Sequence, residues 1–336
     1  MRYFFEPEGF EEYYDYILKG GKSKGYYIDP DACTNVEKTE YYNLLTNFLN
    51  CREQENGSTD KFLYIPPKKA KNTCEEDMKN EYIDDYKIVV LKNDEVLFRL
   101  TTDQFGFSAV ESIYVTEANM KKYPLSRMVL LSRDKTDDQK EEIRKQLIKH
   151  VINSRTLGGA FVWPIPKEGN RTSEYNKKRG VGSYIEDRVD LTLWEVKCFY
   201  QIYEKLSEKT YDAFIEKYDK EYKKNRLFHC GENIKDEYQA MYKFLAHFGT
   251  FDNYINFFCF NKNFVRNGKI VDIVNSIVSE GNIKYLEDRE NIDTNKKEIQ
   301  SITEIEVLHH VLENVSSLIL KRSEDMEGIL NGKQSR

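Results

Sequence analysis

The segment between residues 153 and 190 has the residue types of an anion-binding site. It contains a Gly-Gly pair, a basic loop between Lys167 and Gly180, and several arginines near the start of a predicted helix. A helix N-terminus presents free backbone N–H groups, glycine allows close approach to the backbone, and arginine forks suit phosphate or carboxylate groups. The sequence therefore predicts a site for a phosphate-bearing ligand, with these candidate residues: Arg155, Gly158, Gly159, Asn176, Arg179, Asp187, Arg188 and Asp190.

Most of these candidates would bind the anion directly. We expect Asn176 and the arginines to hold it, and Asp187 or Asp190 to orient an arginine or to act as a base. A nucleotide, NAD or a single-stranded RNA would each supply the phosphate. The sequence selects no cofactor and no catalytic residue, because spacing along the chain does not place an acid or a base beside the basic loop.

A structural interpretation of the same residues remains open. Gly158-Gly159 is typical of a turn, Asp187 is suited to cap the following helix, and Arg188 and Asp190 can pair with neighbours. The segment also lacks the GxxxxGK[ST] pattern of a phosphate-binding loop. No metal site is predicted, because the six cysteines and five histidines show no ligand spacing.

The overall composition limits the classes of function. The chain has 51 Lys and Arg against 57 Asp and Glu, a net charge of −6. Duplex DNA is not an expected partner, since affinity for it comes mainly from neutralised phosphates. We expect neither an export signal nor a membrane segment. The scattered cysteines fit a reducing compartment, so the expected location is the cytoplasm.

The candidate residues must be positioned by an α+β fold. Alternating or β-branched runs predict a hairpin from 87–91 and 96–100, and further strands at 127–131 and 160–163. Helical spacing predicts helices at 40–49, from 137, from 187, over 238–260 and over 302–319, with a frayed tail after Lys321. We predict a small, mainly antiparallel sheet packed against helices, with the second half mostly helical.

We expect one domain over residues 1–336. Its parts are an acidic, Tyr-rich segment at 1–60, a strand-rich part at 60–165 and a helical part at 166–322. The first segment supports a second hypothesis, in which the protein is an interaction module, with a regulatory or defence role and no catalytic activity, and residues 1–60 contact a protein partner. Tyrosine is enriched at such interfaces. A third reading, a toxin-like nuclease, needs a catalytic His or paired carboxylates near the basic loop.

Three sequence blocks resemble an uncharacterised family of bacterial proteins. They are RTLGGAFVWP at 155–164, NKKRG at 176–180 and DRVDLTLWE at 187–195. They are similar to that family's TIGG-strand-Pro, NxxRG and DRxDLTLE motifs, although Trp194 interrupts the last one. The resemblance spans residues 150–275, including a Phe-rich segment at 242–258, with a fainter similarity over 30–110. It implies no activity, because the family has none established, but it supports the choice of segment.

Overall fold

A computed structural model describes residues 35–64, 88–104, 134–154, 156–165, 188–221, 235–292 and 305–334. In chain order its elements are α2 (Asn35–Glu55), β1 (Lys61–Tyr64), β2 (Ile88–Lys92), β3 (Glu95–Gln104), α5 (Asp137–Ser154), the 3-10 turn η3 (Leu157–Gly159), β4 (Ala160–Ile165), α8 (Val189–Tyr203), α9 (Tyr211–Glu221), α10 (Lys235–Phe248), α11 (Phe251–Phe257), β5 (Val265–Arg266), β6 (Lys269–Ile270), η4 (Val278–Glu280), η5 (Leu286–Asp288) and α13 (Ile305–Gln334).

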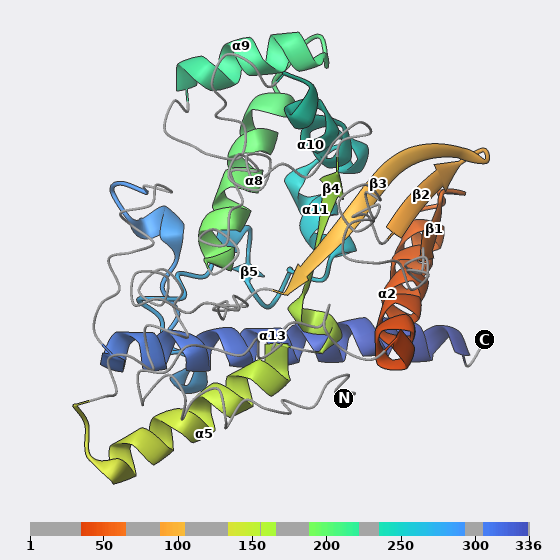
Figure 1. The fold of residues 1–336 in the computed structure, drawn as a ribbon. Helices are drawn as coiled ribbons and strands as arrows, with labels where there is room; N and C mark the ends of the chain where they lie inside the picture. Colours follow the sequence, from red (N-terminus) through yellow and green to blue (C-terminus); the bar gives the residue numbers. More distant parts are fainter. Residues whose placement is uncertain are drawn as a thin grey trace, which may run out of the picture.

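A four-stranded antiparallel sheet has its strands in sequence order, β1-β2-β3-β4 (Figure 1). The predicted hairpin is confirmed as β2 and β3. Its turn residues Asn93 and Asp94 have φ values of 52° and 64°, as expected for the two-residue turn that suits the twist of paired strands. A second, two-stranded sheet joins β5 and β6. The predicted α+β class, with a small antiparallel sheet and a mostly helical second half, is confirmed.

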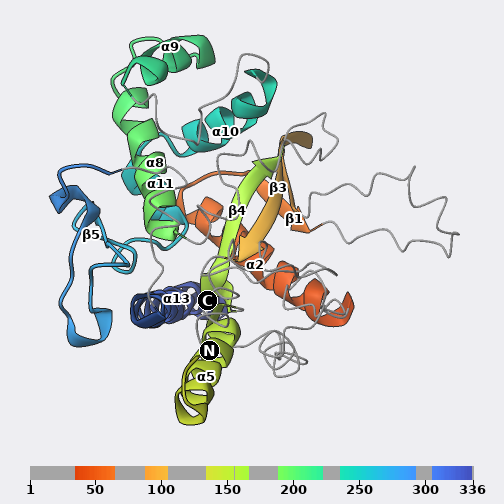
Figure 2. The ribbon, with the colours of Figure 1, turned by 60° about the vertical axis from the view of Figure 1, so that its left-hand side comes forward.

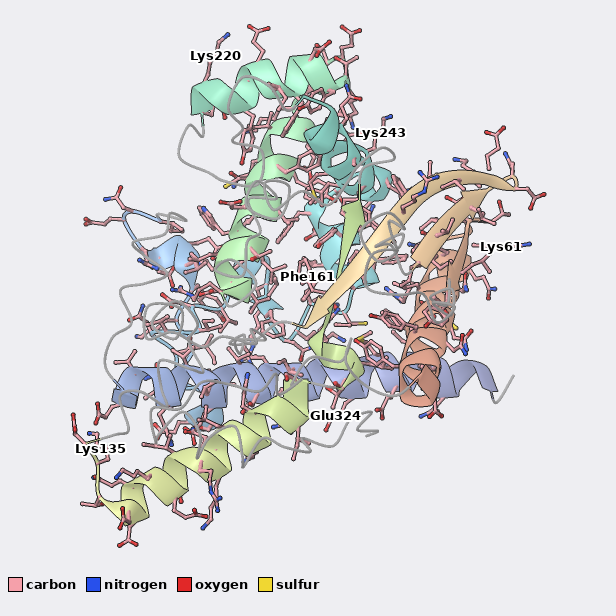
Figure 3. All side chains as sticks on the ribbon, in the orientation of Figure 1. Lys61, Lys135, Phe161, Lys220, Lys243 and Glu324 are labelled. Atoms are coloured by element: carbon pink, nitrogen blue, oxygen red, sulfur yellow. The ribbon has the colours of Figure 1, made fainter. Side chains whose placement is uncertain are left out.

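One face of the four-stranded sheet is buried. Cross-strand neighbours Phe62, Val90 and Phe98 are each at most 7% exposed, because side chains alternate between the two faces of a strand. α2 lies against β1, and α10 lies against β4. At the centre of the molecule, Phe161 of β4 packs 5.8 Å from the ring of Phe260 (Figure 3).

The predicted core helix after residue 187 is confirmed as α8. Val189, Leu193, Val196 and Tyr200 of its apolar stripe are buried. The Tyr200 hydroxyl donates to the backbone oxygen of Leu245, at 2.7 Å, and so joins α8 to α10. Burial raises the pKa of this phenol well above its usual value, which keeps it neutral and able to donate.

The long helix α13 lies against α2, α5 and η3 (Figures 1 and 2). The prediction that the chain frays after Lys321 is wrong, because α13 continues to Gln334. Arg322, Ser323 and Met326 are at most 1% exposed. The polar ones among them bond to groups of η3 and of the turn after α11. These two side chains are therefore buried with hydrogen-bond partners, whereas their neighbours Lys321, Glu324 and Asp325 are exposed.

Buried apolar side chains from α2, the sheet, α8–α11 and α13 form one continuous cluster. Among the described helices, none carries an apolar stretch of the length needed to cross a bilayer. The predicted strand at 127–131 and most of the acidic segment 1–60 lie outside the described residues.

Candidate ligand-binding cleft

The structure describes four of the eight predicted site residues. Arg155, Asn176, Arg179 and Asp187 lie outside the described residues. Gly158, Gly159, Arg188 and Asp190 are described, and their surroundings follow.

Gly158 is held against α13. A Cβ at this position would lie 2.2 Å from the backbone oxygen of Ile319 and 2.4 Å from Ser323 Oγ. The Gly158 N–H donates to Ser323 Oγ at 2.8 Å, and the Gly159 N–H donates to the backbone oxygen of Thr156 at 3.0 Å. Close helix packing therefore accounts for the first glycine, and both N–H groups have partners within the protein. A contact of either glycine with a ligand remains a prediction.

Arg188 and Asp190 form a buried, forked ion pair at the start of α8. Arg188 Nε and Nη2 lie 2.9 Å from the two oxygens of Asp190, and the side chains are 3% and 0% exposed. The carboxylate also accepts from the backbone N–H groups of Leu191 and Ile273, at 2.9 and 3.3 Å. The N-cap position is Arg188, whose side chain makes no capping bond. The pair has the arrangement that the structural interpretation expects, and its role toward a ligand remains a prediction.

A cleft that the sequence analysis missed is lined by α11, the turn after it and the β5–β6 hairpin. Its volume is about 460 Å³, within the range of roughly 300–1,000 Å³ typical of small-molecule sites. The lining residues are Asp252, Ile255, Asn256, Asn261, Lys262, Val265, Arg266, Asn267 and Gly268.

One wall of the cleft is the exposed face of α11. Thr250 caps this helix by accepting from the N–H of Asn253 at 3.2 Å. Tyr254 and Ile255 are buried, whereas Asp252 and Asn256 are exposed. Residues four apart share a helix face, so Asp252 and Asn256 line the cleft together.

A tight turn after α11 directs the chain to the opposite wall. Cys259 has φ of 54°, its N–H donates to the backbone oxygen of Asn256, and the N–H of Phe260 donates to that of Ile255. This is the Schellman arrangement, which usually places glycine at the left-handed position. Lys262 also has a positive φ of 68°. Left-handed residues other than glycine cost free energy and persist where the surrounding contacts hold them.

The second wall is the β5–β6 hairpin. Its turn residues Asn267 and Gly268 have φ values of 52° and 71°, the same turn geometry as in the β2–β3 hairpin. Val265 is buried beneath it, and Arg266 is half-buried. The turn therefore places Arg266 and Asn267 on the cleft.

Three cations from distant parts of the chain hold this backbone frame by its carbonyl groups. Arg52 of α2 donates to the oxygens of Asn256 and Phe257, at 2.8 and 3.3 Å. Lys197 of α8 donates to the oxygen of Gly268 at 2.7 Å.

The third cation, Arg322 of α13, donates to the oxygen of Phe258 at 2.7 Å and stacks on the ring of Phe260 at 4.3 Å. It also donates to the oxygens of Gly158 and Ala160, at 2.6 and 2.8 Å. One side chain therefore joins the cleft's turn to the Gly-Gly segment predicted from sequence.

Lys262 and Arg266 provide positive charge to the cleft. Within the described ranges neither forms an ion pair, and Arg266 Nε is buried without a hydrogen-bond partner. Nearby cations differ, because Lys197 pairs with Glu287 at 2.5 Å and Lys269 pairs with Asp288 at 2.8 Å. A buried donor without a partner carries a free-energy cost that a bound anion would remove.

The candidate nucleophiles beside the cleft, the Cys259 thiol and the Tyr254 hydroxyl, are not activated. Burial raises the pKa of the Cys259 thiol to about 11, so the thiol is protonated at neutral pH and is a poor nucleophile. Burial also raises the pKa of Tyr254. Over the described part of the chain, no group of three His, Cys, Asp or Glu side chains is arranged to hold a metal ion.

Sequence reasoning had one usable signal for this cleft. Asn267-Gly268 is a strong hairpin dipeptide flanked by Arg266 and Lys269. That signal predicts a turn bearing cations. It does not predict that α11 lies opposite, because the wall is assembled by contacts from α2, α8 and α13.

Comparison with known proteins identifies one similarity. Residues 125–229 match a family of unknown function (DUF6994). The match includes η3, β4, α8 and α9, and thus all three sequence blocks of the predicted site, whereas the cleft at 252–268 lies outside it. No curated protein and no solved structure matches the chain.

Proposed function

We propose that this protein binds a phosphate-bearing small ligand in the cleft between α11 and the β5–β6 hairpin. The observation that carries the proposal is the pair Lys262 and Arg266, two cations that line one cleft and form no ion pair with any described residue. Arginine and lysine donors are the usual protein partners of phosphate.

The rigidity of the frame also supports this proposal. Backbone carbonyls of α11, of the turn after it and of the hairpin are bonded to Arg52, Arg322 and Lys197. A frame that is held before binding loses less conformational freedom when the ligand arrives. The predicted site at 153–190 remains an alternative location for the same ligand class, and the cytoplasmic location remains a prediction.

The test is a thermal-shift titration of the full chain with inorganic phosphate, sugar phosphates, nucleotides, NAD and a short RNA. A ligand at 100 times its Kd stabilises the folded state by about 2.7 kcal/mol. We expect the shift to be lost in Lys262→Ala/Arg266→Ala. It should be retained in the charge-matched control Lys220→Ala/Lys243→Ala, whose lysines extend from α9 and α10 (Figure 3).

A third variant, Arg155→Ala/Arg179→Ala, separates the two locations. Loss of the shift in this folded variant alone would assign the ligand to 153–190 and overturn the cleft proposal. The absence of any shift with every member of the panel would also overturn it, and would favour the interaction module.

The interaction-module hypothesis depends on tyrosines of residues 1–60 that contact a protein partner. Tyr41 and Tyr42 of the acidic segment are 0% and 2% exposed, so these two rings belong to the core and are not available to a partner. Contact of a protein partner with the remainder of residues 1–60 stays a prediction, because most of that segment lies outside the described residues.

A further inference from the structure

The cleft contains a carboxylate as well as two cations, and this mixture restricts the ligand. Asp252 is exposed on the α11 wall, and its carboxylate makes no hydrogen bond or ion pair with any residue that the structure describes. A carboxylate repels a phosphate but accepts hydrogen bonds from hydroxyl groups. A ligand that binds both the two cations and Asp252 therefore needs an anionic group and a group that donates hydrogen bonds.

Three amide side chains extend this polar surface. Asn256, Asn261 and Asn267 line the cleft, and their side-chain amides form no hydrogen bond within the described ranges. An amide offers both donors and an acceptor. A hydroxyl group also does both, so several adjacent hydroxyls match this set better than an apolar group does.

The described lining of the cleft offers no aromatic ring on which nucleic-acid bases could stack, and Arg266 is its one guanidinium. None of its nine lining residues is aromatic. The aromatic rings of this region belong to the core instead: Tyr254, Phe257, Phe258 and Phe260 are at most 3% exposed and pack on one another. Recognition of single-stranded RNA depends strongly on base stacking against aromatic or arginine side chains.

From these observations we propose that the ligand is the phosphate ester of a small polyhydroxylated molecule, a sugar phosphate. Lys262 and Arg266 hold the phosphate. Asp252 accepts hydrogen bonds from the hydroxyls, and the three amides both accept hydrogen bonds from them and donate to them. This assignment rests on the proposed function of the cleft, and it selects among the phosphate-bearing ligands that the sequence leaves open.

The experiment is isothermal titration of the full chain with four probes: inorganic phosphate, glycerol 3-phosphate, ribose 5-phosphate and a short uridine oligonucleotide. We expect ribose 5-phosphate to bind at least 10-fold more tightly than inorganic phosphate, with glycerol 3-phosphate between them. The Asp252→Asn variant should lose most of that preference while it binds inorganic phosphate at least as well, since the variant removes a negative charge.

The matched control is Asp212→Asn. Asp212 is also an exposed aspartate in the first turn of a helix, α9, so it reproduces any effect of the substitution on a helix start. This control should retain the preference for ribose 5-phosphate, and the melting temperatures of both variants establish that they are folded.

Each outcome bears on one of the two proposals. Equal binding of inorganic phosphate and ribose 5-phosphate, both lost in Lys262→Ala/Arg266→Ala, would overturn the sugar-phosphate assignment and leave the phosphate cleft intact. Tighter binding of the oligonucleotide than of ribose 5-phosphate would overturn the assignment in favour of RNA. No binding of any probe would overturn the proposed function itself.

Discussion

Replacing Arg322 with methionine removes a buried guanidinium that joins three parts of the chain. Its donors reach the backbone oxygens of Gly158, Ala160 and Phe258, at 2.6 to 2.8 Å, and the side chain is about 1% exposed. In the variant these three buried oxygens lose this donor. Each unsatisfied buried group costs about 1–3 kcal/mol, so the loss is about 3–9 kcal/mol in total.

An opposing effect reduces that loss. Burial lowers the pKa of Arg322 to about 10, which corresponds to about 3 kcal/mol of cost for holding the charge inside the protein. Methionine removes this cost. We therefore expect a net destabilisation of about 3 kcal/mol, the middle of a range of about 0–6 kcal/mol, which is a large part of the stability of a typical domain.

Urea denaturation, followed by circular dichroism, measures this change as a lower free energy of unfolding. The matched control is Lys321→Met on the adjacent, exposed position, where we expect a change within about 0.5 kcal/mol. If Arg322→Met is as stable as the control, then the three hydrogen bonds contribute nothing net and the reasoning about this side chain is refuted.

Three further predictions follow from the same structure. Gly158→Ala should lower the melting temperature strongly, because its Cβ would meet backbone atoms of α13, whereas Gly328→Ala on α13, where a Cβ meets nothing within 4 Å, should leave it equal or higher; equal effects in a thermal melt would contradict the packing argument. Asp190→Asn should cost about 3–5 kcal/mol in urea denaturation, because it leaves the buried Arg188 without its ion pair, while Glu216→Gln in an exposed pair should leave the free energy of unfolding nearly unchanged; a small loss in the first variant would show that the buried pair contributes little. Stability should fall as the pH rises from about 9 to 11, because burial raises the pKa of Cys259 from 9.0 to about 11 and the folded state then holds a proton that the unfolded state releases; Cys259→Ala should flatten this part of the pH profile of unfolding, and an unchanged slope would rule out the thiol as its source.

Much of the fold was predictable because its signals are local. The β2–β3 hairpin follows from two β-prone runs around Asn93-Asp94, and α5 follows from the acidic start and apolar stripe after Asp137. The stripe of α8 likewise predicts its buried face. Each of these signals involves residues a few positions apart, so backbone preference and periodicity suffice.

The candidate site was predictable only in part. The sequence predicts close approach of a ligand at Gly158, whereas the group that the structure places against this residue is the backbone of α13. Arg188 and Asp190 were recognised as either ligand groups or partners, and the structure pairs them with each other. A glycine or an arginine in the sequence indicates a close contact, but it does not identify the contacting group.

The sequence by itself determined the class of fold, the course of the main helices and the hairpin, and the presence of a polar segment rich in arginine and glycine before α8. The tertiary structure alone decided that α13 continues past Lys321 with Arg322, Ser323 and Met326 buried, and that the β5–β6 hairpin forms a cleft with α11. The physical reason is that the contacts involved join residues that are far apart in the sequence. Arg52 reaches α11 across about 200 positions, and Arg322 reaches η3 across 164; whether such a charged side chain lies in water or bonds to buried carbonyls depends on which distant backbone groups the fold brings to it.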